Sequence, residues 1–215
     1  MNILLLIFDF DWTLADTREA IITAKQETAR KLNLPVASDS EYGSTIGLTA
    51  KAGFRKVYPF LTDKDLDLCV VTYRKFFDGI RKQHPPAYFP GTDKVLAELR
   101  EKDVLCTMAT ARNSRSLHEM LGEWKLDGYF PYILCQEDTA HLKPHPEPVL
   151  KTLKDLSCPP DRAMVVGDMP VDIMMGKGAG TFTCGVTYGN SDREALREAG
   201  ADFIIDSIEE LPGIL

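Results

Sequence analysis

The amino-acid sequence predicts an α/β protein in which a doubly wound parallel sheet forms one domain and an all-helical domain is inserted into it. Short apolar segments alternate with segments of helical periodicity, at the start of the chain and again after Gly91. Between these two parts, residues 16–84 contain helical patterns but no convincing buried strand. Repeated strand–helix–strand units produce a parallel sheet with helices on both faces, and the interruption predicts the insertion.

The first strand is predicted from Ile3 to Phe8, because every residue of this segment is apolar. An apolar run without alternation is typical of a strand that is buried on both faces of a parallel sheet. Asp16 then has the properties of a helix N-cap, with Glu19 three residues later as its capping-box partner. We expect a helix to start there and to continue, with apolar residues at helical spacing, to Leu32.

The inserted domain is predicted to comprise residues 16–84, including a helix over residues 63–81, and a proline-rich break follows it. The larger domain is then formed by residues 1–15 and 85–215. After the break, helices are expected at residues 95–99, 114–122, 146–156, 171–179 and 192–199, and strands at residues 104–109, 132–135, 163–166, 182–186 and 203–205.

Composition and charge argue against several classes of protein. The chain of 215 residues has a formal net charge of -7, so a nucleic-acid backbone is not an expected partner. The first apolar run, of about seven residues, is too short to span a bilayer and ends in carboxylates, unlike a signal peptide. The five scattered cysteines include no Cys-x-x-Cys pair, which favours free thiols in the cytoplasm over a zinc site. We expect a cytoplasmic protein without a membrane partner.

Two carboxylates, Asp9 and Asp11, stand directly after the first apolar strand. Like charges resist burial together unless a positive charge lies near them. Ligands of open parallel sheets bind at the carboxyl ends of the strands, so further polar groups should gather at that edge. The sequence supplies such groups in three other loops, and they are Thr110 with Arg112, Lys143, and Asp168 with Asp172.

Several carboxylates that face one point are suited to a hard cation, and Mg²⁺ prefers oxygen ligands. We expect Mg²⁺ to be held or supported by four residues, namely Asp9, Asp11, Asp168 and Asp172. Next to Mg²⁺ and Lys143, the Asp9 carboxylate can attack phosphorus and form an aspartyl-phosphate, while both positive groups disperse the phosphoryl charge. Asp11 points to the same face of an extended chain and can protonate the leaving oxygen, then deprotonate the attacking water.

These residues resemble, in order, the four motifs of the haloacid dehalogenase superfamily: DFDWTL, TMATAR, LKPHPEP and GDMPVD. Within it, the chain is similar to the phosphoglycolate-phosphatase-like and beta-phosphoglucomutase-like branch, which has a Rossmann-like core and a helical cap of the C1 type. The resemblance implies that Thr110 binds phosphoryl oxygens, that Lys143 steadies nucleophile and phosphate, and that the backbone carbonyl of Asp11 is a metal ligand. It also implies that the helical insertion is the cap.

Trp12 departs from the family pattern, which usually has glycine at this position. We expect its side chain to line the substrate pocket. Three further residues are candidates for contact with an anionic substrate, and they are Ala111 and Arg112, which follow Thr110, and Arg55 in the helical insertion. Two histidines flank Lys143, at positions 141 and 145, and we interpret them as loop histidines rather than as a metal pair.

The predicted function is Mg²⁺-dependent hydrolysis of a small phosphomonoester, such as a phosphoglycolate-like molecule or a sugar phosphate. The resemblance ties Asp11 to phosphate-ester chemistry, since the family's dehalogenases lack this acid and its phosphonate-cleaving members replace it. A sugar-phosphate mutase of the same family and a pyrophosphatase are open alternatives. A phosphoryl-accepting signalling module is an alternative of a different class, although such modules lack a helical insertion. We expect a phosphorylated metabolite as partner, and a monomer or homodimer.

Overall fold

The computed structural model describes residues 2–215, which divide into two compact units. The sheet unit contains the residues up to Leu14 together with Tyr88–Leu215, and the helical unit contains Ala15–Ala87. The chain passes from one unit to the other through β2 (Ala15–Asp16) and β3 (Ala87–Tyr88), which pair as a two-stranded sheet.

The sheet unit is built on six parallel strands, within residues 2–215, in the order β5-β4-β1-β6-β7-β8. These are β1 (Leu5–Phe8), β4 (Leu105–Ala109), β5 (Tyr132–Leu134), β6 (Ala163–Gly167), β7 (Phe182–Val186) and β8 (Phe203–Ile205). Strand β1 lies between β4 and β6, so the three carboxyl ends are neighbours at the point where the strand order reverses. Open α/β sheets bind their ligands at such a point. The predicted doubly wound parallel sheet is confirmed.

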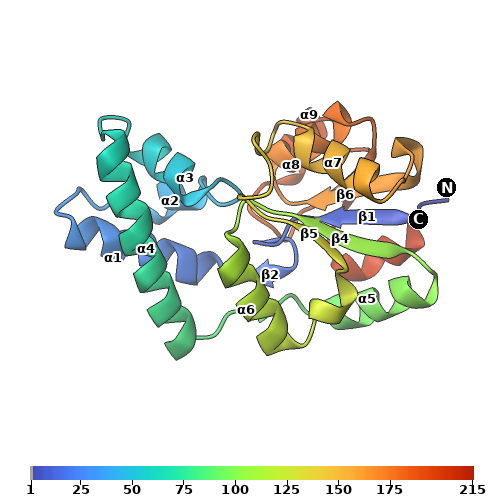
Figure 1. Ribbon diagram of the computed structural model, residues 1–215, viewed down its shortest axis with the longest axis horizontal. Helices are drawn as coiled ribbons and strands as arrows, with labels where there is room; N and C mark the ends of the chain where they lie inside the picture. Colours follow the sequence, from blue (N-terminus) through green and yellow to red (C-terminus); the bar gives the residue numbers. More distant parts are fainter. Residues whose placement is uncertain (1) are drawn as a thin grey trace. The chain divides into compact units, whose positions relative to one another are not determined.

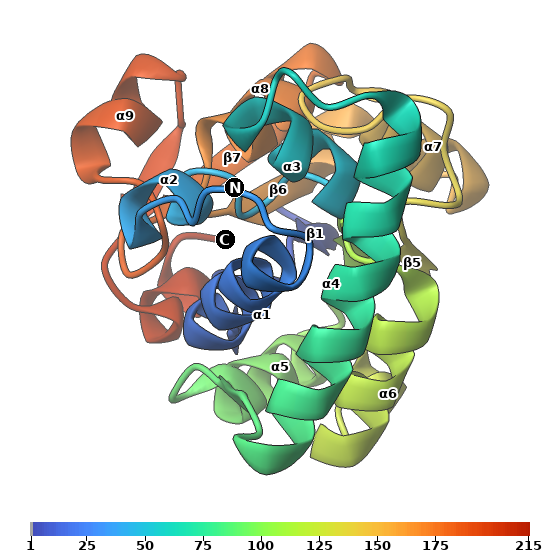
Figure 2. The same ribbon diagram turned by 90° about the vertical axis from the view of Figure 1, so that its left-hand side faces the viewer.

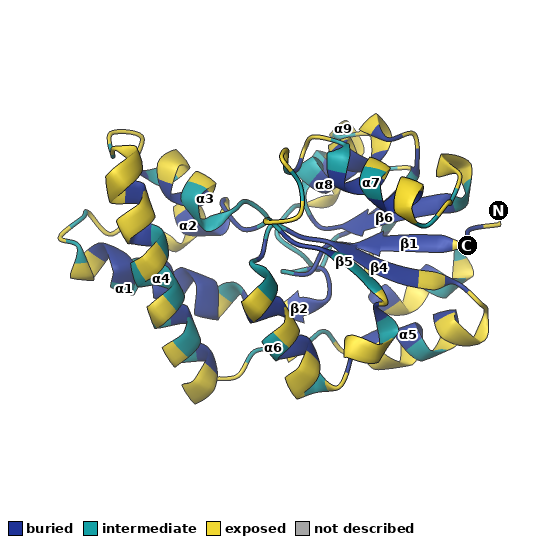
Figure 3. Ribbon diagram, viewed as in Figure 1, coloured by how far each residue is buried: buried dark blue, intermediate teal, exposed yellow. Residues whose placement is uncertain are grey.

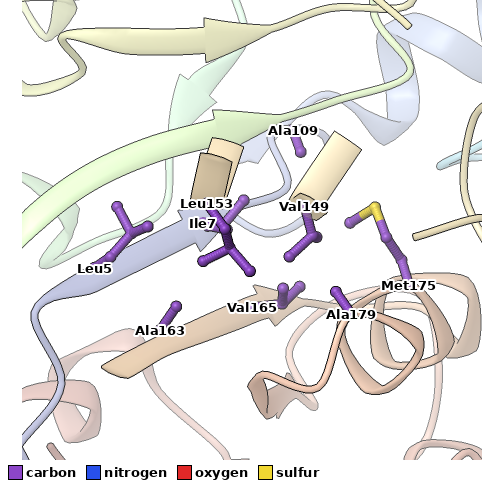
Figure 4. Close-up of a cluster of buried hydrophobic side chains, with 9 residues drawn as sticks. All are labelled: Leu5, Ile7, Ala109, Val149, Leu153, Ala163, Val165, Met175 and Ala179. Carbon is purple, nitrogen blue, oxygen red and sulfur yellow. The ribbon is translucent and has the colours of Figure 1, made fainter. Parts of the chain in front are cut away.

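Helices cover both faces of this sheet, as Figure 1 shows, with α5 and α6 on one side and α7, α8 and α9 on the other. Their bounds are α5 (Thr92–Glu101), α6 (Ser114–Trp124), α7 (Glu147–Asp155), α8 (Pro170–Gly178) and α9 (Arg193–Glu198). Strands β1 and β6 are buried along their whole length (Figure 3), which explains why the sequence of each is continuously apolar. Between these strands and helices α7 and α8 lies an apolar cluster (Figure 4) that includes Ile7, Val149, Val165 and Met175.

The helical unit contains α1 (Arg18–Lys31), α2 (Asp39–Gly43), α3 (Ala50–Val57) and α4 (Asp63–Gln83). Helices α1 and α4 pack side by side (Figure 2). They enclose an apolar core with α2 and α3, and its buried members are Ile22, Ala29, Tyr42, Phe54, Tyr58, Leu66 and Cys69. Helix α4 is the longest of these at 21 residues, but no helix within residues 2–215 combines the length and apolarity that a membrane crossing requires.

The start of α1 differs from the prediction. The helix begins at Arg18 with Thr17 as its N-cap residue, and no side chain caps it, whereas we expected Asp16 to form a capping box with Glu19. Asp16 is instead the second residue of β2. Strand pairing between β2 and β3 takes the backbone of Asp16 out of the cap position, and Glu19 is left as an acidic residue in the first turn, where it complements the helix dipole.

Candidate active site

Four charged side chains meet at the carboxyl edge of the sheet. Asp9 follows β1, Asp168 follows β6, Asp172 lies in the first turn of α8, and Lys143 comes from the loop between β5 and α7. The Nζ atom of Lys143 lies 2.7 Å from Oδ1 of Asp9 and 2.7 Å from Oδ1 of Asp172. Carboxylate oxygens of the three aspartates lie within 4.8 Å of one another, and all four side chains are buried. The structure therefore brings these four predicted site residues together from separate loops.

Asp168 is held in place by groups on two other loops. Its Oδ1 accepts a hydrogen bond from the Thr13 hydroxyl at 3.1 Å, and its Oδ2 accepts one from the Asn190 backbone N–H at 2.9 Å. A Cβ atom on Gly189 would lie 2.1 Å from Cβ of Asp168, so only glycine allows this loop to approach so closely. Sequence reasoning missed all three residues, although Thr13 belongs to the motif that contains the first two carboxylates.

Asp172 is oriented by the start of its own helix. Its Oδ2 accepts a hydrogen bond from the backbone N–H of Met169 at 3.0 Å, which leaves Oδ1 to contact Lys143. A Cβ atom on Gly167 would lie 2.4 Å from Cβ of Asp172. The glycine before Asp168 is therefore required for the carboxylate of Asp172 to pack against the end of β6.

Burial and mutual repulsion dominate the electrostatics of the cluster. Burial raises the pKa of Asp9 to about 7; Lys143 opposes this increase, and Asp172 and Asp11 add to it. Burial also raises the pKa of Asp168 well above its usual value, with further contributions from Asp172 and Asp9. Burial alone would lower the pKa of Lys143, but Asp172 and Asp9 outweigh it and raise that pKa, so the ammonium group stays charged. One lysine thus faces three carboxylates, and the cluster favours additional positive charge.

The donor atoms of the cluster fit a hard divalent cation. Oδ2 of Asp9 is buried, and no group in residues 2–215 donates a hydrogen bond to it. A buried carboxylate oxygen without a partner is costly, and the oxygens around it belong to Asp168 and Asp172. Clustered carboxylate oxygens are the ligands of Mg²⁺-type cations, which complete their coordination with water and substrate oxygens.

Asp11 has a different partner, Arg112. The Nε of Arg112 donates to Oδ2 of Asp11 at 3.0 Å, and its Nη2 donates to Oδ1. The guanidinium also donates to the Ser116 hydroxyl at 2.9 Å and lies over the ring of Phe10 at 5.4 Å from the centroid. Arg112 is only 8% exposed, so the guanidinium that contacts Asp11 is a buried group. A bidentate pair of this kind fixes the orientation of the carboxylate, and sequence reasoning missed it.

Thr110 follows β4 and is buried, and its hydroxyl accepts a hydrogen bond from the backbone N–H of Arg112 at 3.2 Å. Ala111 between them is half-buried in the same turn. Arg55 belongs to the helical unit, on α3, where its Nη2 lies 2.7 Å from Oδ1 of Asp63. The substrate contacts of Thr110, Ala111, Arg112 and Arg55 stay predictions.

Trp12 occupies a turn that ordinarily favours glycine. Its φ angle is +65°, in the left-handed region, where a Cβ atom is disfavoured. The backbone N–H of Leu14 donates to the carbonyl of Phe10 at 3.0 Å and closes this turn. Glycine adopts this backbone conformation without steric cost, which explains why the family usually has glycine at this position. The predicted contact of the Trp12 side chain with substrate stays a prediction.

Comparisons with known proteins agree with this geometry. The family model described as haloacid dehalogenase-like hydrolase matches residues 6–186. Probable phosphatase IndB of Dickeya dadantii is 31% identical over 214 residues, which cover 97% of this chain and 92% of that protein. Pyrophosphatase PpaX of Anoxybacillus flavithermus is 30% identical over 219 residues, which cover 100% of this chain and 98% of that protein.

A crystal structure from Bacteroides fragilis, described as a haloacid dehalogenase-like hydrolase, has a TM-score of 0.92 and 26% sequence identity. The match covers 98% of this chain and 100% of that chain. The resemblance that the four motifs indicated is confirmed, and the chain belongs to the haloacid dehalogenase-like hydrolase family.

Proposed function

We propose that this protein is a Mg²⁺-dependent phosphatase that hydrolyses a small organic phosphate through an aspartyl-phosphate on Asp9. One observation carries the proposal: a buried carboxylate, Asp9, contacts a buried lysine at 2.7 Å and lies among further carboxylates at the carboxyl edge of the sheet. The name of the relative IndB, a probable phosphatase, supports the same activity.

The proposed reaction has two steps. A carboxylate oxygen of Asp9 attacks phosphorus, the bond from phosphorus to the leaving oxygen breaks, and Asp11 gives that oxygen its proton. Water then attacks the phosphorus of the aspartyl-phosphate, Asp11 takes a proton from this water, and the Asp9 carboxylate is released with inorganic phosphate. Arg112 orients the ionised Asp11 carboxylate through the bidentate contact.

Lys143 contacts the nucleophile and adds a fixed positive charge where phosphoryl oxygens bind. Mg²⁺, held by Asp9, Asp168 and the backbone carbonyl of Asp11 with support from Asp172, would supply further neutralisation of the phosphoryl charge. The proposed substrate is a small phosphorylated metabolite, and the proposed location is the cytoplasm.

Pyrophosphate is a second candidate substrate. The relative PpaX is named a pyrophosphatase and aligns with the whole of this chain. The chemistry at Asp9 would be the same for both substrates, since only the leaving group differs. A comparison of kcat/KM for organic phosphates and for pyrophosphate, measured on one preparation of protein, therefore decides between them.

The test is phosphate release from a panel containing phosphoglycolate, sugar phosphates, nucleotides and pyrophosphate, with Mg²⁺ and with EDTA. We expect release that requires Mg²⁺ and that Asp9→Asn abolishes. Asp161→Asn, which changes an exposed carboxylate elsewhere in the sheet unit, should leave the rate unchanged. Absence of release from every compound with Mg²⁺ present would overturn the proposal.

A signalling module is distinguished by the lifetime of its phosphorylated form. After treatment with acetyl phosphate, an enzyme releases phosphate repeatedly, and the phosphorylated protein does not accumulate. A long-lived adduct on Asp9 without turnover would instead favour the signalling alternative.

A further inference from the structure

A second cluster of metal-ligating side chains lies outside the carboxylate site, in the loop that leads from β5 to α7. Its members are His141, His145 and Glu147, and one ligand atom of each lies within 4.8 Å of the others. Both histidines are exposed and Glu147 is half-buried, so an ion can reach the cluster from solvent. The sequence pattern showed only two loop histidines, and the fold adds the carboxylate.

The contacts within the cluster bring its three side chains together. Nδ1 of His141 lies 2.7 Å from Oε2 of Glu147, and the two imidazole centroids are 4.4 Å apart. The backbone N–H of Glu147 donates to Nδ1 of His145 at 3.2 Å. That ring nitrogen is therefore the unprotonated one, and a metal ion that binds there takes the place of this hydrogen bond.

The carboxylate of Glu147 is held before any ion binds. Its Oε1 accepts a hydrogen bond from the backbone N–H of Ala140 at 2.9 Å, and its Oε2 accepts one from the backbone N–H of His141 at 2.9 Å. These two bonds connect the first turn of α7 to residues 140 and 141 of the loop before it. The ligands thus come from one segment whose two ends are already joined, which reduces the conformational entropy that binding must overcome.

We propose that His141, His145 and Glu147 form a binding site for a transition-metal ion of the Zn²⁺ class, separate from the carboxylate site. Two imidazoles and one carboxylate are a ligand set suited to Zn²⁺ or Co²⁺, whereas Mg²⁺ takes oxygen ligands. Three protein ligands leave a coordination position for water.

The position of this site has a consequence for the neighbouring lysine. The ligands at positions 141, 145 and 147 flank Lys143, whose ammonium contacts the buried carboxylates. An ion bound there would add a further link between the two ends of the segment that carries Lys143. The backbone amides of the non-proline residues within 140–147 should exchange with deuterium more slowly when the ion is present.

Titration of the full-length protein with Co²⁺, in an excess of Mg²⁺ that saturates the carboxylate site, tests the proposal. We expect one saturable Co²⁺ ion per chain, with visible absorption typical of low coordination number, and Zn²⁺ should displace it. His141→Ala and His145→Ala should each weaken binding at least about 10-fold. His118→Ala is the matched control, because His118 is an exposed histidine on α6 that bonds the carbonyl of Ser114, and it should bind as wild type does.

A second measurement needs no variant. Zn²⁺ should protect His141 and His145 of the wild-type protein from modification by diethyl pyrocarbonate, read by mass spectrometry, and should leave His118 reactive. Equal reactivity of all three with and without Zn²⁺ would overturn the proposal, as would undiminished Co²⁺ binding by the His141→Ala, His145→Ala double variant. The test measures metal binding, so its outcome is independent of phosphatase activity.

Discussion

Charged groups are used differently in the two units. At the carboxyl edge of the sheet unit, the side chains of Lys143 and Asp9 are 3% and 1% exposed and form a contact of 2.7 Å. In the helical unit, the side chains of Arg55 and Asp63 form a contact of the same length but are 48% and 76% exposed. Lys25 is an exception in the helical unit, since it is buried and donates to the Thr45 hydroxyl.

The difference shows where the chain accepts an energetic cost. Burial of charge costs several kcal/mol per ion, which a buried ion pair only partly recovers. Exposed pairs cost little and stabilise little. The helical unit derives its stability from its apolar and aromatic core. The sheet unit keeps more buried carboxylates than cations at one edge, which lowers its stability. Such an arrangement serves the binding of a ligand, not the stability of the fold.

The largest effect is expected from Lys143→Met. It leaves Asp9 and Asp172 without their cation, so the free energy of unfolding should fall by about 3–5 kcal/mol and kcat/KM by about 10²-fold or more. Urea denaturation and phosphate-release kinetics measure the two effects. Lys154→Met, which changes an exposed lysine on α7, is the control, and equal unfolding curves for the two variants would contradict the prediction.

In the helical unit, Tyr58→Phe tests how much the hydrogen bonds of a buried hydroxyl contribute to the free energy of unfolding. The Tyr58 hydroxyl lies 2.5 Å from the Tyr42 hydroxyl and donates to the carbonyl of Pro35 at 2.7 Å. Its removal takes one hydrogen-bond partner from the buried Tyr42 hydroxyl, and the free energy of unfolding should fall by about 1–3 kcal/mol. Tyr129→Phe, which removes the hydroxyl of a half-buried tyrosine in the sheet unit, serves as the control. Unfolding curves of Tyr58→Phe equal to those of the wild type would show that the aromatic core tolerates the change.

Substitutions of Trp12, which has an unusual backbone conformation, should change stability by a smaller amount. Trp12→Ala and Trp12→Gly both remove the indole, but only glycine adopts a φ of +65° without steric cost. The glycine variant should therefore be more stable than the alanine variant by about 1 kcal/mol, measured by urea denaturation. Equal stability would mean that this turn relaxes when the indole is absent.

The smallest effect on stability is expected from Arg55→Ala. An exposed pair contributes about 0–1 kcal/mol, and salt should reduce that contribution further. The same variant tests the predicted substrate contact: KM should rise if Arg55 binds an anionic substrate. Unchanged KM with unchanged stability would assign Arg55 to the solvated surface of α3.

Local pattern and strand-end position were enough to predict the parallel sheet and the residues that cluster at its edge. Continuous apolar runs identify strands buried on both faces, and the carboxyl ends of such strands lie at one edge whatever their order. For this reason Asp9, Lys143, Asp168 and Asp172 could be grouped before their distances were known. Their catalytic and metal-binding roles are proposals that the experiments above address.

Only the tertiary structure determined which partners these residues have. The pairing of Asp11 with Arg112, the bond from Thr13 to Asp168 and the meeting of His141 with Glu147 depend on how separate turns approach one another. Asp16 shows the same limit, because its capping pattern was overridden by pairing with a strand about seventy residues away. Periodicity reports which face of an element is apolar, but a hydrogen-bond partner is decided by three-dimensional packing, to which residues far apart in the chain contribute.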